Sequence, residues 1–202
     1  MFRSIVQDFV TLLVVVNPIA KVPLFIVLTD QLAPNRQRAV AVRAIVVSLL
    51  VLLFFMVCGQ PALAALGVNL VSVQIAGGLI LLILGLRMVL DEAREPSRQA
   101  AGEPEDIAVF PLAMPFIAGP GAIMSVMVLT DNDLYTLRDQ AETFVALLAV
   151  LAISLVALLG ARALNRLLGR TGVNVVSRVM GLILASLAVQ SMLTGLRVVL
   201  GR

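Results

Sequence analysis

Six apolar segments constrain this chain more than any other feature of its sequence. Residues 43–67, 68–90, 143–161 and 179–200 each approach the roughly 20 apolar residues that cross the hydrocarbon core of a bilayer. Residues 5–29 and 107–130 are equally long but contain prolines. A content of 60% hydrophobic and 13% charged residues is not that of a soluble domain. We therefore predict an all-α membrane protein with six transmembrane helices.

The residues that the sequence lacks exclude several kinds of chemistry. Without histidine the chain has no histidine metal ligand, no Ser–His dyad and no histidine proton shuttle. It also has no G-x-x-x-x-G-K-[ST] loop, which excludes ATP-driven pumping by this chain alone. No acidic residue lies deep in an apolar segment. We therefore expect a protein that is not an enzyme and has no cofactor or metal; coupling to Na⁺ or H⁺ is compatible with the sequence but unassigned.

The chain repeats three features in the same order, which predicts a duplication. The two proline-interrupted segments read NPIAKVP at residues 17–23 and MPFIAGPG at residues 114–121. Later in each half follow two further pairs of similar segments: GVNLVS at 67–72 against GVNVVS at 172–177, and GLRMVL at 85–90 against GLRVVL at 195–200. We predict two three-helix repeats, 1–90 and 107–202, joined by a cytoplasmic connector at 91–106 within one membrane domain.

The basic residues indicate how the repeats are oriented. If all six segments cross, ten arginines fall on one face and four on the other, and an excess of basic residues marks the cytoplasmic side. This count places both termini outside and residues 91–106 inside. Three crossings per half make the second repeat inverted relative to the first. The alternative, in which the two interrupted segments are re-entrant hairpins, would separate the basic residues of 162–178 from the others.

Two prolines five residues apart predict a broken helix in each interrupted segment. Proline removes a backbone donor and clashes with the carbonyl four residues earlier, but it suits the first turn of a helix. Pro23 and Pro120 are therefore expected to open second half-helices, after breaks that begin near Pro18 and Pro115. Paired broken helices in a duplicated membrane chain point to a transport site near the bilayer midplane. The N–H groups at such helix starts attract anions.

A few polar residues accompany these breaks. Lys21, the only lysine, falls in the first break and could pair with a substrate carboxylate or stand in for a cation; alternatively it extends its amine to the membrane surface. Asn17 and Ser125 are candidate polar contacts, although each could instead satisfy its own helix. On the last helix, Ser186, Gln190 and Thr194 share one face, which we expect to look towards protein or water.

Residues 17–25 (NPIAKVPLF) and 111–123 (PLAMPFIAGPGAI) resemble the motifs of the MarC family, and the resemblance extends over the whole chain. It implies a prokaryotic inner-membrane protein, related in fold to LysE-type exporters, in a family with a member that transports small neutral amino acids such as glycine and alanine. Many relatives carry an acid where this chain has Asn17, so a coupling role is not carried over to that position. The site residues that the resemblance implies are Asn17, Pro18, Lys21, Pro23, Pro115, Ala118, Gly119, Pro120 and Gly121, and Ser125 joins them on its polarity.

These observations favour a secondary transporter of a small zwitterion. A channel or passive facilitator, or an exporter of other small metabolites or drugs, remains open. An intramembrane enzyme is disfavoured by the lack of histidine, with Asp8 its only remote candidate, and a structural or chaperone-like role would not explain two breaks. The expected partners are a small-molecule substrate and the lipid bilayer, with no nucleic acid; a homo-oligomer is compatible with the sequence.

Overall fold

The structure of the protein is a computed structural model that describes residues 5–90 and 108–201. Every regular element in these ranges is a helix, as the sequence predicted. The elements are α1 (Ile5–Val16), η1 (Ile19–Lys21), α2 (Val22–Thr29), α3 (Pro34–Ala65), α4 (Leu70–Leu90), η2 (Ala108–Ile117), α6 (Pro120–Leu129), α7 (Leu137–Leu159) and α8 (Ala161–Val199). η1 is a 3₁₀-helix and η2 is a π-helix. The connector expected at 91–106 lies outside the described residues.

Within residues 5–90 and 108–201, five stretches are long and apolar enough to cross a membrane. They are Ile5–Thr29, Pro34–Ala65, Val71–Leu90, Leu137–Leu159 and Asn174–Val199. The sixth expected segment, 107–130, is divided between η2 and α6, which have 10 residues each. A helix of that length spans only about 15 Å, half of the hydrocarbon core. A sixth crossing therefore stays a prediction, which requires η2 and α6 to act together.

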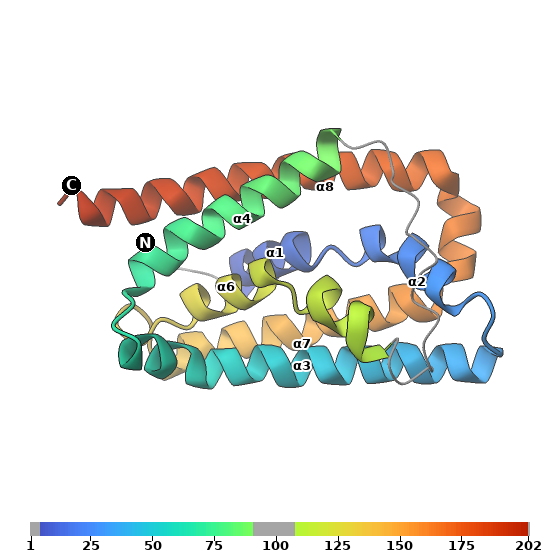
Figure 1. Cartoon of the computed structure of the whole chain (residues 1–202), viewed down its shortest axis with the longest axis horizontal. Coiled ribbons are helices and arrows are strands. Elements are labelled where there is room, and N and C mark those ends of the chain that lie inside the picture. Colours follow the sequence, from blue (N-terminus) through green and yellow to red (C-terminus); the bar gives the residue numbers. More distant parts are fainter. Residues whose placement is uncertain (1–4, 91–107, 202) are drawn as a thin grey trace.

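Successive passes of the chain along the bundle run in opposite directions (Figure 1). α1 with α2, then α4, then α7 run one way, whereas α3, then η2 with α6, then the long part of α8 run the other way. The start of α1 and the end of α8 consequently lie towards the same end of the bundle. α8 changes direction at Gly169, whose φ of 61° lies in the region that glycine adopts without a Cβ penalty.

Two buried clusters hold these helices together. The larger one joins α1, α2, α3, η2, α6 and α7, and its fully buried members include Leu12, Leu52, Ile117 and Leu147. The smaller one is formed by Val14, Leu81, Leu184 and Ala188, and it ties the α4–α8 pair to α1. α4 and α8 are the most extensively paired helices of the molecule (Figure 1).

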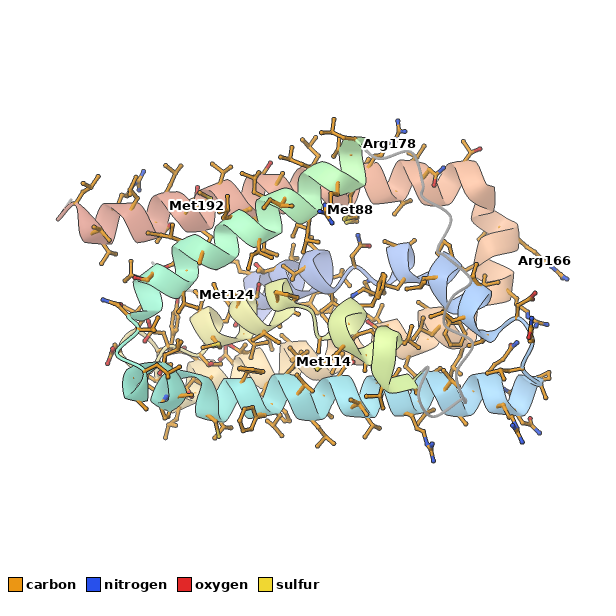
Figure 2. All side chains as sticks on the ribbon, viewed as in Figure 1. Met88, Met114, Met124, Arg166, Arg178 and Met192 are labelled. Atoms are coloured by element: carbon orange, nitrogen blue, oxygen red, sulfur yellow. The ribbon has the colours of Figure 1, made fainter. Side chains whose placement is uncertain are left out.

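Glycines allow close contacts on α3, α4 and α8, and methionines fill several of them. A Cβ at Gly77 of α4 would overlap the side chain of Met124 on α6, and one at Gly59 of α3 would lie 2.9 Å from Cγ of Met127, also on α6. Met124 is labelled in Figure 2. At Gly85 the neighbour is backbone instead, because an added Cβ would lie 2.7 Å from the carbonyl oxygen of Gly181 on α8. α6 therefore contacts α3 and α4 through long, unbranched side chains.

The polar residues of α8, whose face we expected to look towards protein or water, do not pack against other helices. Ser186, Gln190 and Thr194 are exposed in the structure. The Ser186 hydroxyl donates to the Leu182 carbonyl at 2.9 Å, and the Thr194 hydroxyl donates to the Gln190 carbonyl at 2.9 Å. Hydroxyls that bond their own helix in this way need no partner from a neighbour.

Candidate functional site

The first interruption begins at Asn17, which ends α1. Asn17 has a φ of 46°, a left-handed conformation that asparagine tolerates better than most residues. Its backbone N–H donates to the Leu13 carbonyl at 2.8 Å, and its Oδ1 accepts from the backbone N–H of Ala20 at 3.3 Å. The side chain thus bridges the end of α1 to η1. Asn17 is only 6% exposed, so this turn is a buried one.

Lys21 ends η1 and is also buried, at 8% exposure. Its backbone N–H donates to the carbonyl of Pro18, itself buried, at 3.3 Å. Within the described parts of the chain, the side-chain amine of Lys21 has neither a hydrogen-bond acceptor nor a carboxylate partner. Pro23 lies in the first turn of α2, where its missing N–H leaves no helix bond unmade. A largely buried lysine is thus placed directly before a helix start.

The second interruption is shorter and consists of Ala118 and Gly119. η2 runs through Pro115, so the chain stays helical at the first proline of this motif. The Ala118 N–H donates to the Ala113 carbonyl at 2.9 Å, five residues back, which closes the last turn of η2. Gly119 is extended, with φ of −79° and ψ of 171°, and Pro120 then opens α6. The break therefore precedes Pro120 alone.

The end of α1 and the start of α6 lie against each other. A Cβ at Gly121 would overlap the Leu81 side chain of α4 and would lie 3.5 Å from Cγ1 of Val15 in α1. Asn17 lies near α4 as well, with its Nδ2 3.9 Å from Sδ of Met88, whose side chain is labelled in Figure 2. α4 is thus the common neighbour of both interruptions.

Other predicted site residues lie further from this contact. η1, which carries Lys21, packs mainly against α8 and α2. Ser125 is buried one turn after Gly121, and its hydroxyl has no hydrogen-bond partner among the residues that the structure describes. Pro120 is exposed and Pro23 is half-buried. The structure therefore brings Asn17 and Gly121 to α4, and it directs the backbone of Lys21 towards α8.

Sequence reasoning underestimated Asp8. Asp8 is 3% exposed in α1, and its Oδ2 accepts a hydrogen bond of 2.7 Å from the hydroxyl of Thr143 on α7. The carbonyls of Asp139 and Leu129 lie 3.1 Å and 3.3 Å from the same hydroxyl. An acid inside the apolar segment 5–29 was the available signal, but nothing in the sequence indicated Thr143 as its partner. No cluster of three potential metal ligands occurs in the described ranges.

Comparison with known proteins gives one family and many relatives. Residues 2–200 match the model of the MarC family of integral membrane proteins. The UPF0056 inner membrane protein YhgN of Escherichia coli (strain K12) is 34% identical over 197 residues, covering 96% of this chain and 97% of that protein. The UPF0056 membrane protein MJ1677 of Methanocaldococcus jannaschii is 35% identical over 193 residues, covering 94% of each chain. No solved structure matches.

Proposed function

Because the chain belongs to the MarC family of integral membrane proteins, we propose that it is a secondary transporter of small solutes, with small neutral amino acids as its substrates. The observation that carries this proposal is the contact between the helix ends that border the two interruptions, where Gly121 at the start of α6 packs beside Val15 near the end of α1. Irregular backbone at membrane depth is tolerated only where it is buried in protein or lines a cavity. In transporters such paired breaks form the substrate site.

We further propose that residues 1–90 and 107–202 are two inverted repeats. The directions of the passes support this pairing, since α1–α2 opposes η2–α6, α3 opposes α7, and α4 opposes α8 (Figure 1). In this arrangement η2 and α6 together make the fourth of six crossings. With the arginine-rich loops in the cytoplasm, both termini are outside. The relative YhgN is an inner membrane protein by name, which supports an inner-membrane location in a prokaryotic cell.

The proposed site would bind the two charges of an amino acid by different means. The first turns of α2 and α6 have no side-chain cap and no acidic residue. In α6 the N–H groups of Gly121 and Ala122 have no acceptor within the helix, because a helix leaves its first N–H groups unpaired. These N–H groups are suited to a carboxylate. The Lys21 amine would add a positively charged group from the first interruption. Carbonyls of the interrupted backbone would accept from the substrate ammonium group.

This site calls for a small substrate. Leu81 and Val15 pack close to Gly121, so little room is left for a side chain larger than a methyl group. Ser125, with its unpaired hydroxyl, is one turn away and can contact the substrate. Glycine and alanine fit these limits, and neither needs a buried acid for its ammonium group when carbonyls are present.

The proposal is tested with purified protein in proteoliposomes. Radiolabelled glycine and alanine should accumulate above the external concentration when a Na⁺ or H⁺ gradient is imposed, whereas leucine and glutamate should not. Protein-free liposomes and an ionophore that removes the gradient are the controls. Equilibration without accumulation would instead identify a channel or passive facilitator. Absence of uptake and exchange for every amino acid would contradict the proposed substrate class.

A further inference from the structure

A cavity lies at one end of the bundle, away from the two interruptions. Its volume is about 170 Å³, and it is formed where α2 and α7 end and α3 and α8 begin. These four helix ends gather at the right-hand side of Figure 1. A cavity needs only about 10–15 Å³ of such space to hold one water molecule, so this one can take a group of several atoms.

Two of the four polar side chains that line the cavity, Thr29 and Gln37, already have hydrogen-bond partners. The Thr29 hydroxyl donates to the Phe25 carbonyl at 2.7 Å. The Gln37 amide nitrogen donates to the carbonyls of Thr29 at 2.7 Å and Leu32 at 3.0 Å, which uses both of its donors. These bonds fix the turn between α2 and α3. They leave the cavity wall with few donors of its own.

The two remaining donors are the guanidinium groups of Arg38 and Arg162. No carboxylate of the described residues pairs with either arginine, and the one acid between Thr29 and Arg43, Asp30, does not line the cavity. Arg38 lies near the start of α3 and Arg162 near the start of α8. Neither helix has an acidic residue in its first turn. Cations at helix starts are electrostatically unfavourable, so an anion in the cavity would offset both charges and both helix dipoles.

We propose that this cavity binds a phosphate group, either of a phospholipid head or of a soluble phosphorylated molecule. Guanidinium groups match phosphate oxygens with two parallel hydrogen bonds each, and two arginines from different helices can hold one phosphate from two sides. The cavity lies at the ends of stretches long and apolar enough to span a membrane, where lipid head groups are expected, and basic pockets between transmembrane helices bind anionic head groups. Phe25 and Leu158 give it an apolar wall beside the charges.

The test measures thermal unfolding of the full-length protein in a neutral detergent. Short-chain phosphatidylglycerol, short-chain phosphatidylcholine and inorganic phosphate are titrated separately at constant ionic strength. We expect a saturable rise in Tm with phosphatidylglycerol. Arg38→Gln and Arg162→Gln should each raise the half-saturating concentration by about tenfold, a change that corresponds to one lost charge-assisted contact. Arg36→Gln is the matched control, because Arg36 lies in the same exposed turn but does not line the cavity.

Each outcome supports or overturns the proposed phosphate site. A Tm rise with phosphatidylglycerol but not with inorganic phosphate identifies the lipid head as the source, and an equal rise with inorganic phosphate identifies a soluble phosphate. No rise, a rise that survives in the Arg38→Gln/Arg162→Gln protein, or an equal loss in Arg36→Gln would overturn the proposal. If the double variant does not fold, Arg38→Lys serves instead, with an intermediate loss expected because lysine keeps the charge without the planar fork. The test has no transport readout, so its result leaves the proposed transport function untouched.

Discussion

The two helix interruptions occupy similar places in the two halves of the chain, yet they are built differently. The first is formed by a left-handed Asn17, whose side chain bonds the next turn, and it includes a buried Lys21. The second has an extended Gly119 and then Gly121, which is packed against neighbouring side chains. The first interruption therefore depends on side-chain chemistry, and the second depends on space. Substitutions at the two interruptions should therefore impair the protein for different reasons.

The largest expected effect is that of Gly121→Val. The added methyl groups would meet Leu81 and Val15, and overpacking of this kind costs about 1–3 kcal/mol. Because the same atoms would fill the space proposed for substrate, amino-acid uptake in proteoliposomes should fall to background. Ala76→Val, on the exposed face of α4, adds two methyl groups where there is room and should leave uptake near the wild-type rate. Wild-type uptake by Gly121→Val would remove the second interruption from the site.

Lys21→Met should separate activity from stability. Methionine nearly matches the length of the side chain but removes the charge of a largely buried lysine whose amine has no partner in the described residues, so thermal stability should rise by about 1 kcal/mol or more. Uptake should fall by roughly tenfold, the effect of losing one charge-assisted contact to the substrate carboxylate. Lys21→Arg is the control that keeps the charge. Unchanged uptake in Lys21→Met would mean that the amine only extends towards the membrane surface.

Asn17→Ala should give the smallest of the three effects, and it acts on stability. Alanine loses the hydrogen bond from the Ala20 N–H and must hold a φ of 46° without a local bond, which costs about 1–2 kcal/mol in all. Asn17→Gly loses the same bond but has no Cβ penalty, so its loss should be smaller. Thermal unfolding in detergent measures both. A larger loss for glycine than for alanine would show that backbone strain is not what Asn17 relieves.

The sequence predicted the helical architecture because apolar length is a local property. It also predicted helix starts near Pro23 and Pro120, since proline favours the first turn of a helix wherever it lies. The expected break at Pro115 is absent from the structure. That proline lies inside the π-helix η2, whose closing bond reaches five residues back. A proline clashes with the carbonyl four residues earlier in an α-helix, whereas the hydrogen bonds of a π-helix reach five residues back.

Features that depend on distant pairs were not predictable from the sequence. Asp8 and Thr143 are 135 residues apart, and only the packing of α1 on α7 brings them into contact. We expected the α8 face with Ser186 and Thr194 to look towards protein or water because of its polarity alone. In the structure their hydroxyls bond carbonyls of their own helix, so they do not determine which way that face of α8 points. The proposed site residues themselves remain predictions that the variants above will test.

The methionine contacts of α6 have a consequence for movement. Met124 and Met127 fill the spaces left by Gly77 and Gly59, and each thioether side chain has three rotatable bonds. Displacement of α6 along α3 and α4 would therefore require changes in side-chain torsions at these points, not the separation of interlocked branched side chains. α4 and α8 also meet backbone to backbone, at Gly85 and Gly181, besides the contact at which Met192 of α8 lies against Gly78, so this pair is less free to slide than α6. α6 thus contacts its neighbours through flexible side chains, and it can shift along them by changes in side-chain torsions, whereas the α4–α8 contact is more rigid.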